Sequence, residues 1–322
     1  MIIRRVSIWV FLPFLLSHSS LSCQEWSKFT FSKPGMGTLF TLTFYAIEER
    51  QANEASMASF MELERLEQLF SDYRSDSYIN LLSAQLTLNQ RKVIPTELFE
   101  VLWLSNELYQ QSNGVFDPTI GPLSKLWREA QKSGKFPEKN KVLKAKEQVG
   151  FNRILLHQED HSIVFLADSI KFDFGGIAKG YTADRLAMIL ESYGIHAYLI
   201  DAGGDLLIGD APPTLPSWRI GIEGGYQEIK EVNLVNTAIA TSGSTYRYLV
   251  HEGIHYSHII DPRTGYGITH HQVLSVQASS AALADGLAST LSILTPDMGE
   301  RMLTEKFPKV TYKTFNHHQK IP

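Results

Sequence analysis

The chain of 322 residues contains one cysteine, Cys23, so no disulfide can form within it. Basic residues form no run beyond Arg4 and Arg5, and acidic and basic residues are interspersed at a formal net charge of −4. A basic surface for nucleic acid is therefore not expected. The apolar run at residues 8–16 is shorter than the about 20 residues that a membrane-spanning helix needs.

Long linkers, low-complexity tracts and internal repeats are also missing, so residues 25–322 are expected to form one domain. A chain of about 300 residues can bury about 75% of the surface that its unfolded form exposes. The hydrophobic content of 43% is ordinary for a globular protein. A large core is therefore feasible without disulfides.

A positive start, an apolar centre and a polar exit of small residues make residues 1–22 an expected export signal. Cys23 follows at once, at the position where a bacterial lipoprotein is cut and lipidated. Leu21 departs from that pattern by one position, so simple cleavage that leaves a free thiol is the alternative. Either route places the mature protein in the cell envelope, and a lipid would anchor it at the periplasmic side of the inner membrane.

Hydrophobic periodicity predicts helices and strands in mixed order. Helices are expected at 49–70, from Pro95 onward, at 179–192 and at 281–294, the last ending before Pro296, and the basic stretch 132–146 is expected to be a loop. Strands are expected at 38–46, 154–156, 163–166, 197–201, 206–208, 218–222, 237–241 and 246–250. This order indicates an α+β fold, a single domain with a mixed sheet, rather than a doubly wound parallel sheet.

The segment from Lys171 to Met188 is the most informative part of the sequence. Asp173 precedes a glycine pair, and a predicted helix with Lys179 in its first turn follows. Glycines allow a tight turn and close approach of a ligand, and unpaired N–H groups at a helix start suit a phosphate. Taken alone, the segment fits equally well a plain strand-to-helix turn with a surface lysine.

Three other turns carry residues suited to ligand binding. Asp117 stands before a proline, which favours an extended backbone, and its carboxylate can accept a hydrogen bond from a ligand. Tyr73 follows the first predicted helix, where its ring either stacks on a planar ligand or belongs to the rim of the core. His258 and Asp261 flank a short strand that ends in a Pro-Gly turn, although a lone histidine is more often structural.

Asp285 and Ser289 are four residues apart in a predicted helix and therefore share a face. A carboxylate and a hydroxyl alone do not make a tight site for a hard cation. A backbone carbonyl, waters and the phosphates of a ligand would complete the octahedron of Mg²⁺. The alternative is a surface acid on an amphipathic helix.

Eight segments, and the order in which they follow one another, resemble those of the FAD:protein FMN transferases, the ApbE-like family of exported and often lipid-anchored flavin transferases. The resemblance runs from about Lys33 to Leu294. The segments are GMGT, FSDYRSDS, GVFDPTIGPLSKLW, DFGGIAKGYTAD, DAGGD, ATSGS, YSHIIDPRTG and ADGLAS. The resemblance implies a protein that binds FAD with Mg²⁺, moves FMN onto a threonine or serine hydroxyl of an exported or membrane-bound redox protein, and releases AMP.

The same resemblance implies roles for single residues. The positions that contact FAD would be Met36, Tyr73, Val115, Phe116, Asp117, Asp173, Lys179 and Ile259. The metal ligands would be the Gly176 carbonyl, Asp285 and Ser289, and the catalytic residues His258 and Asp285. Ala288 stands where some relatives have a second aspartate, so binding of the metal without FAD is expected to be weak.

The implied reaction needs charge neutralisation and a base. Attack on the phosphorus next to riboflavin displaces AMP, and Mg²⁺ on the pyrophosphate would neutralise the growing negative charge. His258 either takes the proton of the acceptor hydroxyl or carries FMN transiently as a nucleophile. Two other functions fit the same residues: an FAD pyrophosphatase with water as acceptor, and a lipoprotein that carries FAD without transferring it.

Overall fold

The structure is a computed structural model that describes residues 25–224, 228–243, 248–270 and 272–316. The expected export signal and Cys23 lie outside the described residues. Within the described part of the chain, the helices are too short or too polar to cross a membrane.

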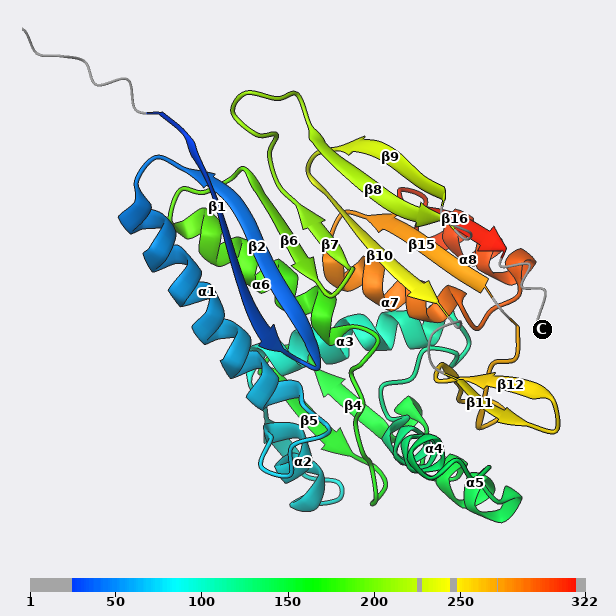
Figure 1. The fold of residues 1–322 in the computed structure, drawn as a ribbon. Coiled ribbons are helices and arrows are strands. Elements are labelled where there is room, and N and C mark those ends of the chain that lie inside the picture. Colours follow the sequence, from blue (N-terminus) through cyan, green and yellow to red (C-terminus); the bar gives the residue numbers. More distant parts are fainter. Residues whose placement is uncertain (1–24, 225–227, 244–247, 271, 317–322) are drawn as a thin grey trace, which may run out of the picture.

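A seven-stranded sheet forms the centre of the molecule (Figure 1). Its strands are, in spatial order, β1 (Ser27–Gly35), β2 (Thr38–Ala46), β6 (Tyr198–Ala202), β7 (Leu206–Ile208), β10 (Thr237–Gly243), β15 (Gln272–Ala278) and β16 (Thr311–Asn316). All six pairings are antiparallel. The expected α+β class is confirmed, since helices and strands follow one another in mixed order along the chain. The central sheet was expected to be mixed, but its strands pair antiparallel throughout.

Strand β2 shows how the sheet acquires an apolar face. Phe40, Leu42 and Phe44 alternate with threonines and have no exposed surface. Successive residues of a strand point to opposite faces, so these three side chains share the face toward the core. They pair with Ala202, Ile200 and Tyr198 of β6, which are buried on the same face. Burial of each such large side chain contributes about 1.5–3 kcal/mol.

Three helices pack on the apolar face: α1 (Glu49–Phe70), α6 (Ala178–Ser192) and α7 (Ala281–Leu291) (Figure 1). A fourth, α3 (Thr96–Gln111), packs against α7. The predicted bounds of α1 are confirmed, and α3 begins directly after Pro95 as expected. The hydrophobic core lies between these helices and the sheet.

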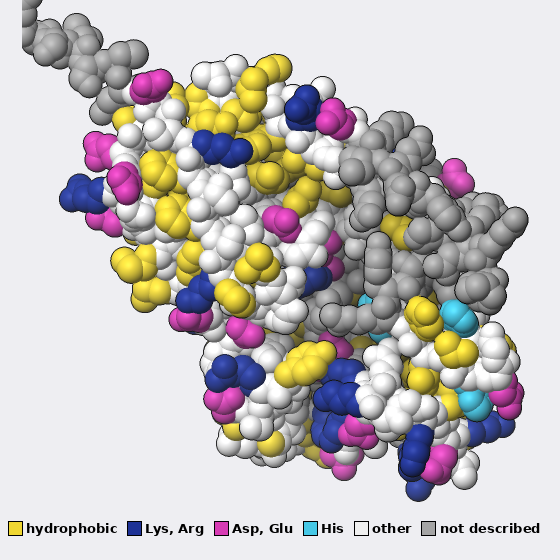
Figure 2. Space-filling view, in the orientation of Figure 1, with side chains coloured by type: hydrophobic (Ala, Val, Ile, Leu, Met, Phe, Trp, Pro, Cys, Tyr) yellow, Lys and Arg dark blue, Asp and Glu magenta, His cyan; other side chains and the backbone are white. Residues whose placement is uncertain are grey.

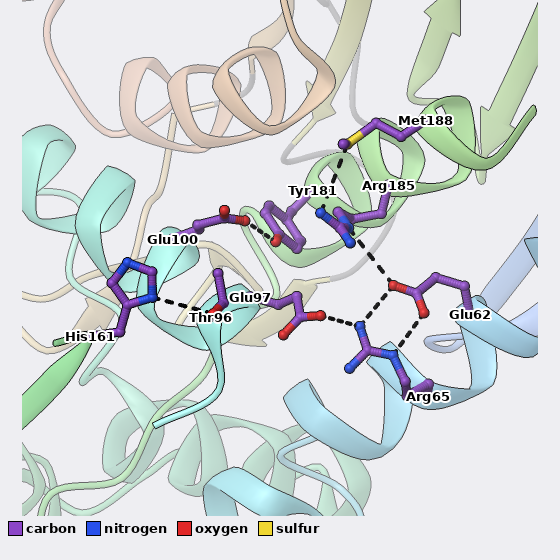
Figure 3. A network of polar contacts seen from close by, with 9 residues as sticks. All are labelled: Glu62, Arg65, Thr96, Glu97, Glu100, His161, Tyr181, Arg185 and Met188. Carbon is purple, nitrogen blue, oxygen red and sulfur yellow. Dashed lines mark hydrogen bonds and ion pairs between the residues drawn. The ribbon is translucent and has the colours of Figure 1, made fainter. Parts of the chain in front are cut away.

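Polar side chains tie α1, α3 and α6 together (Figure 3). Arg65 of α1 donates to both oxygens of Glu62 at 2.7 and 2.8 Å and to Glu97 of α3 at 2.5 Å. Arg185 of α6 lies 3.8 Å from Glu62. The hydrogen bond from Arg65 is the main reason why the pKa of Glu62 lies below its ordinary value. The network therefore links the three helices through charged side chains as well as through the core.

A hairpin of β8 (Trp218–Gly224) and β9 (Glu228–Leu234) packs on the opposite face of the sheet, over residues of β2, β6 and β7. The ring of Trp218 packs against that of Tyr45 on β2 with centroids 5.9 Å apart. Ile208, Trp218 and Ile220 form a small buried cluster here.

A second, smaller core lies between two helices and two hairpins. The helices are α4 (Gly121–Ser133) and α5 (Lys139–Lys146), and the hairpins are β11 (Tyr248–His251) with β12 (Ile254–Ser257) and β13 (Ile260–Asp261) with β14 (Tyr266–Gly267). Trp127 of α4 is 1% exposed and packs against the rings of Phe136 and Tyr256. Its indole N–H donates to the carbonyl of Gly265 at 2.9 Å, which ties the turn between β13 and β14 to α4.

The remaining elements form the lower part of Figure 1 and the end of the chain. They are α2 (Tyr78–Ala84), a small sheet of β3 (Arg91–Val93), β5 (Ser162–Phe165) and β4 (Ile154–His157), a 3₁₀ turn at Phe151–Arg153, and α8 (Pro296–Lys306). The hairpin expected around 154–166 is confirmed as β4 and β5. Acidic and basic side chains are interspersed over the face shown in Figure 2.

Two predictions about helices are wrong. The stretch 132–146, expected to be a loop, contains the end of α4 and all of α5. The stretch is mostly polar, and one apolar residue, Val142, anchors α5 in the smaller core with 1% of its surface exposed. Pro296, expected to end the last helix, opens α8, because a proline is well tolerated in the first turn of a helix.

Candidate active site

Helices α6 and α7 cap each other at their N-terminal ends. Asp184 of α6 accepts from the N–H groups of Ala281 and Ala282 at the start of α7, at 2.8 and 2.9 Å. Asp285 of α7 accepts from the N–H of Gly180 at the start of α6, at 3.1 Å. These carboxylates satisfy N–H groups that have no partner within their own helix. The helices can approach closely because Gly180 has no Cβ, and a Cβ there would lie 2.2 Å from the carbonyl oxygen of Ala281.

The start of α6 therefore offers fewer free donors than the sequence predicts. The N–H groups of Ile177 and Ala178 donate to the carbonyl of Phe174 at 3.0 and 2.9 Å. The N–H of Gly180 is taken by Asp285. The expectation of unpaired N–H groups for a phosphate is wrong for these three positions, because the preceding turn and α7 satisfy them.

Lys179, Asp205 and Asp285 form a charged trio beside this helix start. The Lys179 Nζ lies 3.0 Å from Oδ2 of Asp205 and 3.3 and 3.4 Å from the two oxygens of Asp285. Asp205 and Asp285 are 7% and 5% exposed. Oδ1 of Asp205 also accepts from the N–H of Thr241 on β10 at 3.0 Å. The trio thus joins α6, α7 and the turn between β6 and β7.

Burial and neighbouring charges shift the pKa values of Lys179 and Asp285. Burial is the largest influence on Asp285 and raises its pKa to about 6, with a further rise from Asp205 and an opposing effect from Lys179. Burial opposes the charge of Lys179, but Asp285 and Asp205 outweigh it and raise the pKa above the ordinary lysine value. The Nζ of Lys179 lies within 3.4 Å of both carboxylate oxygens of Asp285. The ammonium group is therefore the cation that neutralises Asp285.

The glycine turn at residues 173–177 meets α7 at a second point. A Cβ on Gly176 would lie 2.7 Å from Oγ of Ser289, 3.1 Å from its Cβ and 3.5 Å from the ring of Phe116. Ser289 follows Asp285 by about one helical turn, so both side chains face α6 and the glycine turn. The three residues expected to bind metal, Gly176, Asp285 and Ser289, therefore lie along one contact between the turn and α7. Their role as ligands stays a prediction.

The loop before α4 carries three of the residues expected to contact FAD. Val115, Phe116 and Asp117 are 2%, 8% and 7% exposed. Oδ1 of Asp117 accepts from the N–H and the hydroxyl of Thr119 at 2.8 and 2.6 Å, and Oδ2 accepts from the N–H of Phe151 at 3.1 Å. Burial raises the pKa of Asp117 against these bonds. The donors expected from a ligand thus come from the chain itself, and the carboxylate holds the loop in place.

Tyr73 and Asp173 are connected through an arginine of α4. Tyr73 is 77% exposed, so it does not belong to the core, and the guanidinium of Arg128 lies 4.3 Å from its ring centroid. Arg128 also forms an ion pair with Asp72, and its Nη2 lies 4.0 Å from Oδ2 of Asp173. Oδ1 of Asp173 accepts from the N–H of Gly175 at 2.8 Å. One face of the Tyr73 ring is therefore covered by a cation that also reaches the glycine turn.

Met36 lies in the turn between β1 and β2 with a φ of 50° and is partly buried against the main core. Its Sδ accepts from the hydroxyl of Thr182 at 3.4 Å. Because Thr182 follows Lys179 in α6, Met36 lies beside the first turns of that helix.

His258 and Ile259 lie at the bend between β12 and β13. His258 is exposed and Ile259 is partly buried. The N–H of Ile259 donates to Oγ of Ser257 at 3.2 Å, and its carbonyl accepts from the N–H of Ile268 at 2.9 Å. The backbone groups expected to contact a nucleotide are thus engaged within the chain. The neighbouring turn between β13 and β14 is tied to α4, because the indole N–H of Trp127 donates to the carbonyl of Gly265.

Two residues of this region escaped the sequence reasoning. Asp205 could have been recognised from the sequence, because it is the last residue of the segment Asp-Ala-Gly-Gly-Asp at 201–205, which has an acid at each end and two glycines between them. Nothing in the sequence identifies Arg128 as part of the site, since an arginine in an amphipathic helix is usually solvated. Among the described residues, groups of three or more histidines, cysteines and acids placed to hold a metal ion are absent. A metal at Asp285 would therefore depend on neutral oxygen ligands and on a bound phosphate.

Comparison with known proteins gives a consistent result. The profile described as the ApbE family matches residues 36–312. The chain is 30% identical to the FAD:protein FMN transferase of Chlamydia muridarum over 237 residues, which are 72% of this chain and 73% of that protein.

Solved structures agree with the sequence comparison. A histidine-to-glycine mutant of the flavin transferase ApbE from Vibrio cholerae superposes with a TM-score of 0.80 at 25% identity, covering 89% of this chain and 93% of that one. The apo flavinyl transferase ApbE from Pseudomonas stutzeri has a TM-score of 0.78 at 26% identity, covering 89% and 90%.

Proposed function

The chain belongs to the ApbE family, and we propose that it transfers the FMN part of FAD to a hydroxyl of a partner protein and releases AMP. The observation that carries this function is the contact between the glycine turn and α7. There a Cβ on Gly176 would lie 2.7 Å from the hydroxyl oxygen of Ser289, which is one helical turn from the carboxylate of Asp285. Hard oxygen ligands in this arrangement suit chemistry on a pyrophosphate.

In this reaction the acceptor oxygen bonds to the phosphorus next to riboflavin. The bond from that phosphorus to the bridging oxygen breaks, and AMP leaves with the electron pair. The proton of the hydroxyl passes to a base, for which we propose His258, exposed at the bend after β12. General base catalysis of this kind contributes roughly 10²–10⁴-fold in rate.

We propose Mg²⁺ as the metal, because the residues present fit it. Gly176 lacks the side chain that would fill the space beside the Ser289 hydroxyl. Asp285 is held in place by the Gly180 N–H and by Lys179 before any ligand arrives. When bound, the ion supplies neutralisation of the charge that develops on the pyrophosphate. Lys179 supplies a second positive charge at the same carboxylate.

We also propose a membrane-anchored location, with a lipid on Cys23 and an exported or membrane-bound redox protein as acceptor. Strand β1 begins at Ser27, four residues after Cys23. Four extended residues reach about 14 Å at most. A lipid on Cys23 would therefore keep the β1 edge of the sheet close to the periplasmic face of the inner membrane. Mass spectrometry of the N-terminal peptide tests this, since a free cysteine or a different first residue contradicts it.

The function is tested by incubating the purified protein with FAD and Mg²⁺, with and without envelope extract of the source cell. AMP release and covalent in-gel flavin fluorescence are measured together. Transfer requires AMP release that depends on the extract and a new fluorescent band. AMP release without extract indicates a pyrophosphatase, and FAD binding without AMP release indicates a carrier. Chelation of the metal and the Asp285→Asn variant serve as controls, because both should abolish the band.

A further inference from the structure

Arg128 lies between two expected parts of the FAD site and has no part in the function proposed above. Its side chain is 26% exposed, whereas most arginines are largely exposed. The guanidinium faces three groups from two other segments: the carboxylates of Asp72 and Asp173 and the ring of Tyr73. Its Nε donates to the Ser124 carbonyl one turn earlier in α4, at 3.2 Å. The helix therefore fixes the direction in which the guanidinium points.

The contact with Tyr73 leaves the ring open on one side. The guanidinium lies 4.3 Å from the ring centroid, within the about 6 Å at which cation–π attraction operates. The residue is nevertheless 77% exposed, so the face away from Arg128 is available to a planar group. An aromatic ring on a loop loses rotational freedom when a ligand stacks on it. Arg128 restricts that freedom beforehand.

The contacts with the two carboxylates hold separate segments together. Asp72 comes from the loop after α1 and Asp173 from the glycine turn, and Arg128 is the cation between them. Burial and the charge of Asp173 raise the pKa of Asp72, and Arg128 opposes that rise. Without the guanidinium the carboxylates would face each other unneutralised. Repulsion would then separate the Tyr73 loop from the glycine turn.

We infer that Arg128 is a positioning residue for the flavin ring of FAD. It keeps one face of Tyr73 open for stacking and keeps that ring at a set place relative to Asp173 of the glycine turn. The inference rests on the proposed function, because that function supplies FAD as the ligand. It assigns the Arg128 side of the site to the flavin half of FAD and gives it no part in recognition of the AMP half.

The test measures binding of FAD by flavin fluorescence in metal-free buffer, with ADP as a competitor that lacks the flavin. Arg128→Ala should raise the dissociation constant of FAD about tenfold, by analogy with the loss of a stacking platform, and leave that of ADP unchanged. The double variant with Tyr73→Ala should bind FAD no more weakly than Tyr73→Ala alone. Arg91→Ala is the matched control, because Arg91 also pairs with two acids, Glu159 and Asp160, but on the small β3–β5–β4 sheet.

Three results would overturn the inference: unchanged FAD binding by Arg128→Ala, an equal loss of ADP binding, or additive effects in the double variant. Urea unfolding verifies that each variant is folded. If the alanine variant does not fold, Arg128→Gln replaces it with the same expectation, because glutamine keeps a donor for Asp72 and removes the charge above the ring. If the wild-type protein binds no FAD, the proposed function fails and the inference fails with it.

Discussion

Replacement of Gly176 by alanine probes the contact on which the proposed function depends. The added Cβ would lie 2.7 Å from Oγ of Ser289 and 3.1 Å from its Cβ, closer than carbon and oxygen atoms normally approach. Either the Ser289 hydroxyl rotates away or α7 shifts from the glycine turn. Overpacking of this kind destabilises a protein by about 1–3 kcal/mol, so the variant should fold with a lower free energy of unfolding.

The larger effect is expected on the metal requirement. If the Ser289 hydroxyl is a ligand, its displacement removes an interaction with a charged group worth about 1.5–3 kcal/mol. That loss corresponds to roughly 10- to 150-fold more Mg²⁺ for half-maximal AMP release. The assay is a Mg²⁺ titration of AMP release at saturating FAD, run beside urea unfolding of the same preparations.

Two further variants separate a local effect from a general one. Gly175→Ala is the control, because its Cβ would contact only Oδ1 of Asp173 at 3.0 Å, and its Mg²⁺ requirement should stay near that of the wild type. Ser289→Ala should raise the requirement by itself, and Gly176→Ala added to it should change little more. A wild-type Mg²⁺ requirement in Gly176→Ala would refute the reasoning, and so would fully additive effects of the two substitutions.

The remaining predictions concern three charged or titratable residues. Asp285→Asn should abolish Mg²⁺-dependent AMP release but stay more stable than Asp285→Ala by about 1 kcal/mol in urea unfolding, because it keeps an acceptor for the Gly180 N–H; equal stability of the two would exclude the capping role. His258→Asn should keep the dissociation constant of FAD and slow covalent transfer by about 10²–10⁴-fold in a fluorescence assay, whereas a wild-type rate removes it from the mechanism. Burial raises the pKa of the Asp184 carboxyl group to about 6 in the folded state. The folded state therefore binds a proton on Asp184 more tightly than the unfolded state does. The contribution of Asp184 to the free energy of unfolding is therefore greatest below about pH 4 and falls by about 3 kcal/mol as the pH rises through 6. In Asp184→Asn this fall should be absent from urea unfolding measured between pH 4 and 7. The same pH dependence in the variant as in the wild type would contradict the prediction.

Sequence reasoning predicted the elements whose pattern is local. Strand β2 and helix α1 have the bounds that alternation and helical spacing indicate, because each buries one face and is limited by turn residues. Helix α5 was missed because a single buried residue, Val142, anchors an otherwise polar helix. Strand β16 was missed because its place at the edge of the sheet depends on pairing with β15, which no local pattern encodes.

At the candidate site, too, features set by local spacing were predicted, and contacts between separate elements were not. The shared face of Asp285 and Ser289 followed from helical spacing, and their grouping with Gly176 was implied by the family resemblance. The structure places Ser289 beside Gly176 and Asp285 beside Gly180. The pairing of Lys179 with Asp205 joins residues of separate elements, so only the folded sheet brings them together. The contact of Arg128 with Tyr73 arises in the same way from the packing of α4 beside the loop after α1.

The failed expectation at the start of α6 explains how the site is built. Free N–H groups at the start of α6 were expected to receive a phosphate, but Asp285 receives the N–H of Gly180 instead. The same carboxylate is the expected metal ligand, and Lys179 neutralises it. Asp285 therefore supports the pairing of α6 with α7 in addition to the metal-binding role proposed for it. A ligand whose direction is set by folding loses little freedom when a metal and FAD arrive. The helix pair thus orients the site, and substitutions that loosen it should impair both stability and turnover.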